Sequence, residues 1–135
     1  MKIILSFCIV MIFFHLNTAG QVYQFTSDRE VSVKVHSTDI KFEKKNISIT
    51  IDLTNKRITL VRGQAMMFTI ISMDTTLINK EDGKNFKCRC IDNKGSKHII
   101  ILMLYSDSIQ RILGVAGTFA VSLGSEYYSY ILYKK

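Results

Sequence analysis

The sequence predicts an all-β domain, a small antiparallel meander of about eight strands that closes as a barrel or packs as a sandwich. Short runs in which apolar and polar residues alternate recur along the chain. Turn-forming residues separate these runs, and none of the 135 residues is a proline. These observations favour one compact unit built from hairpins.

The first twenty residues do not share this pattern and indicate a secretory signal peptide. Lys2 precedes an apolar stretch over residues 3–14, and Thr18 and Gly20 supply the small side chains that signal peptidase requires. As a helix, the stretch would cover roughly 18 Å of a hydrocarbon core of roughly 30 Å, which argues against a membrane anchor. We expect cleavage after Gly20 and a single secreted or periplasmic β-rich domain over residues 21–135.

The clearest alternation lies in the first half of the expected domain. Residues 31–36 and 47–53 each place apolar side chains on one face and polar side chains on the other. Residues 54–56 suit a tight turn, and the alternation resumes over residues 57–61, so the segments on either side of the turn predict a β-hairpin. Residues 66–70 alternate again and predict the next strand.

A second hairpin is predicted from residues 86–91 and 97–105, around a turn in which Gly95 supplies a positive φ. Its second arm differs from the other strands, because residues 99–104 are all apolar. Strands that are covered on both faces have this composition. We therefore expect this strand to lie centrally in the sheet system.

The C-terminal third is less clear, because apolar residues over 107–123 recur at helical spacing. Gly114 and Gly117 would each cost a helix about 1 kcal/mol. We predict strand and loop here, with a short helix near 107–116 as the alternative. Residues 127–133 are aromatic and β-prone, and they predict the last strand.

The charge of the chain excludes some classes of partner. The formal net charge is +7, and the single lysine of the expected leader contributes one of these charges, which leaves +6. The basic residues are dispersed, with no block of five like charges, so we expect no nucleic-acid partner. After signal cleavage, no apolar run is long enough for a helical membrane span.

The expected domain keeps two cysteines, Cys88 and Cys90, because Cys8 belongs to the leader. In a strand, residues two apart lie on one face with Cα atoms roughly 6.6 Å apart, beyond the usual disulfide separation of roughly 5.5 to 6 Å. This favours two buried, reduced thiols beside Phe86, with Lys87 and Arg89 facing outward. A reducible Cys-x-Cys pair and a soft-metal site remain alternatives.

Catalytic machinery is sparse in this sequence. His36 and His98 are the only histidines outside the leader, and we interpret each as a polar residue at a strand end. The chain has neither a Gly-x-Ser-x-Gly elbow nor a glycine-rich phosphate loop. Asp92 stands in a predicted turn, the common structural place for an acid. We therefore predict no catalytic residue, no metal site and no cofactor.

The C-terminal tyrosines are candidates for ligand binding. Tyr128 and Tyr130 share one face of the last strand, and Tyr127 and Tyr133 share the other. An exposed strip of aromatic side chains could stack on sugars or on a peptide, whereas core packing is the structural alternative.

Two functional hypotheses follow. In the first, the protein is an exported, non-enzymatic β domain that binds a small apolar ligand, a glycan or an envelope protein. In the second, it is a small exported thiol-redox factor or enzyme that uses Cys88 and Cys90. A spacious interior would favour carriage of a ligand, and a filled core with exposed tyrosines would favour surface recognition. The residues expected to line the interior are Ile49, Phe68, Phe86 and Leu102.

Overall fold

The computed structural model describes residues 22–79 and 82–135. The predicted signal peptide and its cleavage site lie outside the described residues. The elements are β1 (Val22–Lys34), β2 (Ile40–Asp52), β3 (Arg57–Arg62), β4 (Gln64–Asn79), β5 (Gly83–Asp92), β6 (Lys97–Tyr105), α2 (Asp107–Leu113), β7 (Gly117–Leu123) and β8 (Glu126–Lys134).

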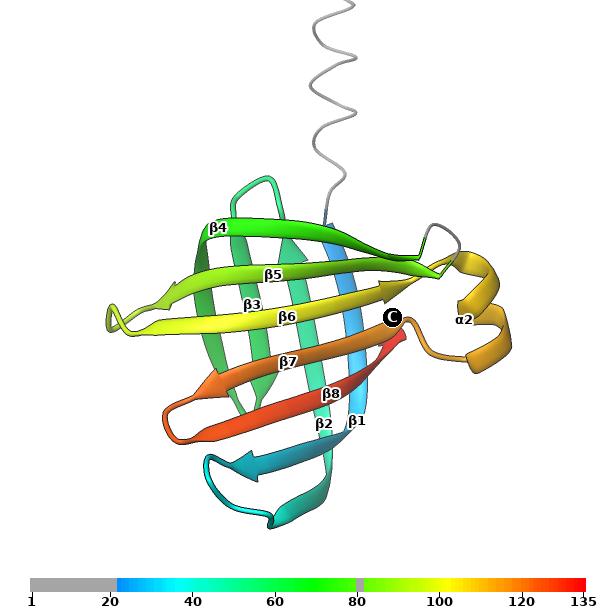
Figure 1. Cartoon of the computed structure of the whole chain (residues 1–135). Coiled ribbons are helices and arrows are strands. Elements are labelled where there is room, and N and C mark those ends of the chain that lie inside the picture. Colours follow the sequence, from blue (N-terminus) through cyan, green and yellow to red (C-terminus); the bar gives the residue numbers. More distant parts are fainter. Residues whose placement is uncertain (1–21, 80–81) are drawn as a thin grey trace, which may run out of the picture.

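The strands form one closed barrel in which each strand pairs antiparallel with the next and β8 returns to pair with β1 (Figure 1). The predicted all-β meander of eight strands is therefore confirmed, and the alternative arrangement as a sandwich is excluded. Closure gives both outer strands a partner, so the barrel ladder has no free edge among the described strands.

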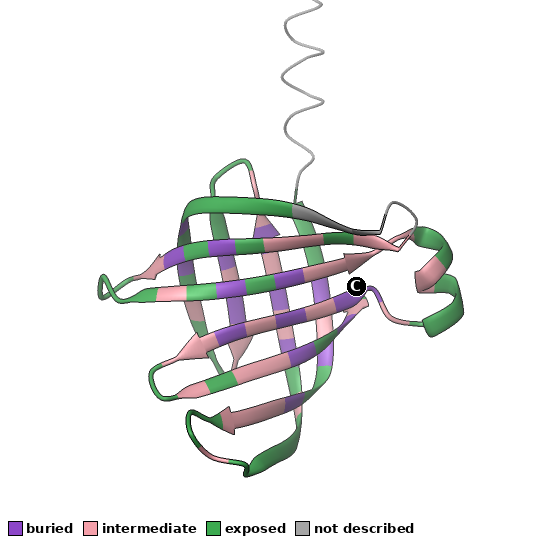
Figure 2. Cartoon of the chain, viewed as in Figure 1, coloured by how far each residue is buried: buried purple, intermediate pink, exposed green. Residues whose placement is uncertain are grey.

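Alternation along the strands builds the core, because every second side chain points into the barrel. Buried and exposed residues accordingly alternate along the ribbons in Figure 2. Aliphatic and aromatic side chains from all eight strands meet inside. The fully buried apolar residues include Ile49, Ile51, Ile58, Leu60, Phe68, Ile100, Phe119, Val121 and Leu132.

The two ends of the barrel differ. At one end, which we call the Gly63 end, lie the connections from β1 to β2, β3 to β4, β5 to β6 and β7 to β8. At the other end, which we call the helix end, lie α2 and the start of β1 and end of β8 (Figure 1). The β1–β2 hairpin is long and projects beyond its neighbours at the Gly63 end.

Residues 99–104 do not form a strand that is covered on both faces, so that expectation was wrong. Ile100 and Leu102 are buried, but Ile99 and Ile101 are 43% and 42% exposed. A single closed sheet buries only its inner face, and no second layer of described strands lies over the outer face of β6. The outward isoleucines are therefore surface residues.

The segment after β6 is the short helix that was the alternative reading, and the preferred strand and loop are wrong for residues 107–113. Gly114 ends the helix in the left-handed conformation, with φ of 70°, and donates its N–H to the carbonyl of Gln110. The strand part of the prediction holds from Gly117 onward, where β7 begins.

Candidate functional site

The barrel interior is filled where a ligand cavity was considered. Ile49 and Phe68 have no exposed surface, and Leu102 is also buried. The hollow that Phe86 and Leu102 share at the helix end measures about 10 Å³. One water molecule needs roughly this much space, so the hollow has no room for an apolar ligand. Binding surfaces must therefore be sought at the ends or on the outer face.

Inward-pointing polar side chains gather at the Gly63 end around a buried carboxylate. We call Glu30, Lys45, Arg62 and Tyr130 the Glu30 cluster. Glu30 is 4% exposed. Arg62 donates to it through Nε and Nη2, each at 2.8 Å, and Tyr130 Oη donates at 2.7 Å. Lys45 Nζ adds a contact of 3.1 Å, so four donors serve the two oxygens.

The cluster is a closed network and not an open anion site. Two nitrogens of Arg62 are committed to Glu30, and its guanidinium carbon lies 4.2 Å from the ring centroid of Tyr128. Tyr128 in turn donates its hydroxyl to Glu126 at 2.7 Å. We infer that the cluster joins β1, β2, β3 and β8 and fixes the shape of the barrel at this end.

The Glu30 cluster predicts that stability falls in acid. Burial alone would raise the pKa of Glu30, but hydrogen bonds from Arg62, Tyr130 and Lys45 hold that pKa below its ordinary value. A carboxyl with a lowered folded-state pKa contributes stability above its unfolded pKa of about 4.3, and the contribution is lost as pH falls through the folded value. Urea unfolding between pH 7 and pH 3 should show this loss.

The matched variants for this pH experiment are Glu30→Gln and Glu43→Gln. Glu30→Gln should be less stable at pH 7, and its stability should decline less steeply below pH 5 because the coupled carboxylate is gone. Glu43, 54% exposed in its ion pair with Lys45, should leave the steep decline intact. Equal slopes in wild type and Glu30→Gln would contradict the assignment.

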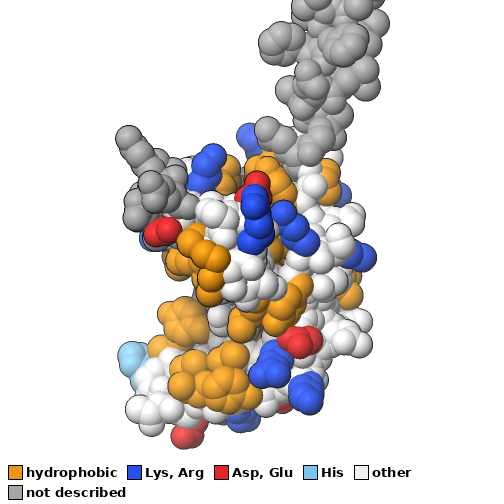
Figure 3. Space-filling model, turned by 90° about the vertical axis from the view of Figure 1, so that its right-hand side faces the viewer, with side chains coloured by type: hydrophobic (Ala, Val, Ile, Leu, Met, Phe, Trp, Pro, Cys, Tyr) orange, Lys and Arg blue, Asp and Glu red, His pale blue; other side chains and the backbone are white. Residues whose placement is uncertain are grey.

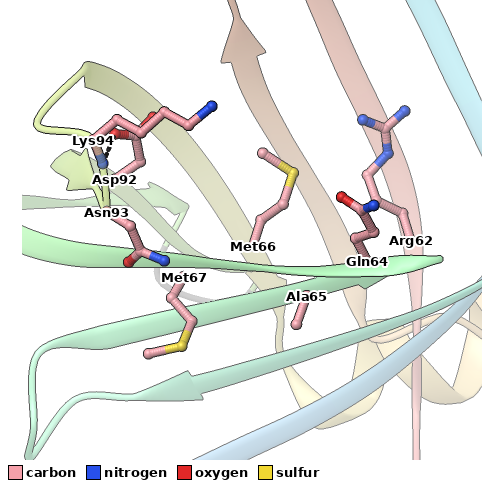
Figure 4. Close-up of a pocket in the computed structure, with 8 residues that line it drawn as sticks. All are labelled: Arg62, Gln64, Ala65, Met66, Met67, Asp92, Asn93 and Lys94. Atoms are coloured by element: carbon pink, nitrogen blue, oxygen red, sulfur yellow. Dashed lines mark hydrogen bonds between the residues drawn. The ribbon is translucent and has the colours of Figure 1, made fainter.

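A pocket of about 500 Å³ opens beside the Glu30 cluster, between the β3–β4 and β5–β6 turns. Figure 4 shows Arg62, Gln64 and Met66 on one side of β4, with Ala65 and Met67 on the other. Lys94 and Asp92 approach from the opposite wall, where Asp92 accepts the backbone N–H of Lys94. Glu30 engages the charge of Arg62, and the Lys94 backbone and His98 engage that of Asp92. The Lys94 ammonium is the one charge of the lining without a partner among the described residues, and a single lysine gives this pocket little selectivity for a charged ligand.

The two histidines lie apart. His36 occupies the turn after β1 with φ of 63°. His98 lies inside β6, where Nε2 is 2.8 Å from Asp92 Oδ2 and Nδ1 is 2.8 Å from the carbonyl oxygen of Ser122. Both partners are acceptors, and no nucleophile completes the pair among the hydrogen bonds of the described residues. The His98 side chain therefore connects β6 to β7, and it contacts no side chain that it could activate as a nucleophile among the described residues.

The two cysteines are buried and unlinked, as the alternation predicts. Cys88 and Cys90 are each 2% exposed and free, and Lys87 and Arg89 face outward. Burial raises the pKa of Cys88 to about 11 and that of Cys90 to about 12. Thiolate is the reactive form, so these groups are poorly suited to thiol exchange in the folded state.

This burial predicts slow modification of both thiols. With a thiol reagent such as dithionitrobenzoate at pH 8, folded protein that begins at Gln21 should react at a rate limited by opening of the barrel. In denaturant, two thiols should react within the mixing time of an ordinary assay. Immediate reaction of either thiol in the folded protein would contradict the burial.

The structure divides the four candidate tyrosines between the two faces of β8. Tyr130 and Tyr128 point inward, where Tyr130 is buried and serves Glu30, and Tyr128 lies beside Arg62. Tyr127 and Tyr133 point outward, and Tyr127 is 54% exposed. Of the four, Tyr127 offers the largest open aromatic surface in the described chain.

Tyr127 belongs to a larger apolar surface on the projecting hairpin. The pairing places Phe42 opposite Val31, and Ile40 opposite Val33, which pairs in turn with Tyr127. The Cβ atoms of such cross-strand neighbours lie about 5 Å apart, so the side chains form a continuous apolar surface. We call this surface the Phe42 patch. It consists of Val31, Val33, Val35, Ile40, Phe42 and Tyr127.

The Phe42 patch is open to solvent. Phe42 is 73% exposed and Ile40 is 55% exposed. In the lower part of Figure 3, hydrophobic side chains gather beside lysine and arginine side chains. The strand pairing gives the Phe42 patch two basic neighbours, because Arg29 and Lys44 face each other in the next outward row.

Sequence reasoning missed Phe42 and Ile40, because no strand was predicted over residues 40–46. The signal was present, since Ile40 and Phe42 alternate with Lys41 and Glu43. The polar members of this run point inward at the open end of the barrel, where Lys45 contacts both Glu30 and Glu43. An alternation with charged residues on the inner side was not recognised as a strand.

Two further properties concern residues 22–79 and 82–135. No helix in these ranges is both long and apolar enough to cross a membrane. Nor do they bring together three or more histidine, cysteine, aspartate or glutamate side chains that could hold a metal ion. Comparison of the chain with protein-family models, with curated proteins and with solved structures finds no match.

Proposed function

We propose that this protein is an exported, non-enzymatic binding domain that recognises another protein through the Phe42 patch. The observation that carries the proposal is the gathering of large, exposed apolar side chains on one projecting hairpin and the adjoining strand β8. Isolated surface apolar residues are ordinary, but a contiguous patch of them is typical of an interaction site.

The composition of the patch suits a protein partner. Phe42 and Tyr127 offer aromatic surface that a partner could bury at low entropic cost, as at the energetic centre of many interfaces. The adjoining pair of Arg29 and Lys44 places two positive charges at one border of the patch. A partner surface with apolar side chains and flanking carboxylates would complement both features.

The filled interior supports surface recognition over carriage within the barrel. The burial of Cys88 and Cys90 gives no support to a thiol-redox function. Export rests on the predicted signal peptide, and it would place the domain in the periplasm or outside the cell. The mature protein should then begin at Gln21, which N-terminal sequencing of protein from the source cells would establish.

Site-specific photo-crosslinking in the source cells tests the binding site. A benzophenone amino acid at position 42 should yield a discrete adduct with one protein partner. The same group at Thr50, which lies in β2 outside the patch, is the matched control and should yield none. Phe42 and Ile40 replaced together by aspartate should abolish co-purification of that partner while leaving the barrel folded.

Three outcomes would overturn the proposal. Absence of any adduct at position 42 would remove the binding site, and equal labelling from positions 42 and 50 would indicate non-specific contact. An adduct of exactly two copies of this chain would assign the patch to self-association and not to a separate partner. The mass of the adduct separates these cases.

A further inference from the structure

A second candidate site lies on the outer face of β4, β5, β6 and β7, away from the Glu30 cluster and the barrel interior. A groove of about 480 Å³ runs here across four strands. We call it the isoleucine groove. Its lining includes Ile71, Arg89, Ile91, Lys97, Ile99 and Ser122, and the His98 ring also borders it.

Two irregularities in the sheet account for the groove. A β-bulge between Ile70 and Ser72 in β4 adds one residue, Ile71, which faces outward and is 62% exposed. The ladder between β6 and β7 ends at the pair of Ile100 and Val121 among the described residues. Past that point, the His98 ring reaches the Ser122 carbonyl where a backbone pair would otherwise lie.

The walls of the groove are apolar. Ile71, Ile91 and Ile99 come from three neighbouring strands, and the short side chain of Ser122 contributes on β7. A volume of about 480 Å³ falls within the roughly 300–1,000 Å³ that small-molecule pockets occupy. The groove is therefore large enough for a small ligand with an apolar body.

The charges of the groove are all positive and unneutralised. Arg89 pairs in register with Ile99 across β5 and β6, and Lys97 pairs with Ile91, so each cation stands beside an isoleucine. Neither cation has a hydrogen-bond or ion-pair partner in the part of the chain that the structure describes. In the Glu30 cluster, by contrast, each cation is already matched by a carboxylate.

From this juxtaposition we propose that the isoleucine groove binds an amphipathic monocarboxylate, with its alkyl chain on the three isoleucines and its carboxylate between Arg89 and Lys97. The fork of the arginine guanidinium matches a carboxylate in a bidentate pair. A neutral apolar ligand would leave both cations unused. The lining contains no phenylalanine, tyrosine or tryptophan, and its one ring, that of His98, is held between Asp92 and the Ser122 carbonyl, so the groove offers no broad stacking platform for a nucleotide.

Titration of the ¹⁵N-labelled mature protein with monomeric decanoate tests this assignment. Saturable amide shifts should cluster at Ile71, Arg89 and Ile99, while core amides such as those of Ile49 and Phe68 stay in place. The probes 1-decanol, which lacks the charge, and acetate, which lacks the chain, should each bind at least about tenfold more weakly than decanoate. Equal binding of decanol and decanoate would overturn the role of the cations.

Variants locate the two halves of the site. Arg89→Gln combined with Lys97→Gln should weaken decanoate binding by about tenfold or more. Ile99→Ser should weaken decanoate binding because it removes an apolar contact with the alkyl chain. This variant gives an independent measurement of the site if the double variant folds poorly. Arg111→Gln, on α2, removes a positive charge away from the groove and should leave affinity unchanged. An equal effect of Arg111→Gln would reduce the binding to general electrostatic attraction and overturn the site.

Other outcomes also decide the matter. Shifts centred on the barrel core would indicate carriage in the interior, and absence of saturable shifts at millimolar decanoate would show that the groove binds no such acid. Binding to vesicles of anionic phospholipid without binding of monomeric decanoate would assign the cations to a membrane surface. Replacement of Phe42 by aspartate should not change decanoate affinity, which keeps this test separate from that of the Phe42 patch.

Discussion

Replacement of Glu30 by alanine is expected to lower the free energy of unfolding by about 3–5 kcal/mol, which is the usual cost of removing one partner from a buried ion pair. The variant would leave Arg62 without the carboxylate that accepts hydrogen bonds from its Nε and Nη2. It would also leave the buried Tyr130 hydroxyl without its acceptor. Unpaired buried donors, and not the loss of one attraction, dominate this cost.

Glu43 provides the matched control for this experiment. It contacts the same lysine as Glu30, with Lys45 Nζ at 2.9 Å, but it is 54% exposed. Ion pairs of exposed residues contribute about 0–1 kcal/mol. Urea unfolding at pH 7 should therefore show a change below about 1 kcal/mol for Glu43→Ala and a several-fold larger change for Glu30→Ala.

A double variant separates buried charge from packing. Arg62→Met combined with Glu30→Leu removes both charges and keeps side chains of similar size, so it should be less destabilised than Glu30→Ala. A coupling free energy near zero between positions 30 and 62 would show that the two side chains act independently. That result, or a small effect of Glu30→Ala, would contradict the inference that the Glu30 cluster holds the four strands together.

Most of the strands that could be predicted from the sequence have apolar residues on the inner face. The hairpin over residues 47–61 and the final strand have this pattern, and they lie where it indicates. The alternation over residues 31–36 also lies in a strand as far as Lys34, but its valines face outward in the Phe42 patch. Alternation is a local property that the chain displays before folding, and it suffices to predict the fold class. It does not decide between a barrel and a sandwich, because closure depends on the pairing of β1 with β8.

The segments that could not be predicted have polar residues on the inner face or an irregular ladder. Residues 22–30 were missed because a register shift between Ser27 and Arg29 interrupts the alternation and Glu30 takes an inward position. Inward polar residues are stable only with partners, and the partner Tyr130 lies 100 residues away in sequence. Local patterns carry no information about such a distant pair.

The candidate sites also depend on residues that are distant in sequence. Sequence reasoning separated the tyrosines into two faces of one strand correctly, but it could not tell which face is core. The Phe42 patch combines side chains from three strands, and the isoleucine groove combines four. Each exists only after the register is fixed, so neither could be derived from spacing along the chain.

Replacement of Gly117 by alanine should destabilise the barrel by about 3 kcal/mol or more, because the new methyl group would meet backbone and not a movable side chain. Gly117 begins β7 and pairs with Leu104 of β6. A Cβ at this position would overlap the carbonyl oxygen of Met103. The strands would have to separate, and the hydrogen bond from the Tyr105 N–H to the Ala116 carbonyl, 3.0 Å long, lies beside the point of separation.

Thr118→Ala is the matched control, since it alters the neighbouring residue of β7 without adding an atom. Urea unfolding should show a much smaller change for Thr118→Ala than for Gly117→Ala. Amide hydrogen exchange supplies the second measurement, because separation of β6 from β7 should lower protection in those two strands while the β2–β3 ladder keeps its protection. Uniform loss of protection in all strands, or a change below about 1 kcal/mol for Gly117→Ala, would show that the close approach of β6 and β7 does not limit this position.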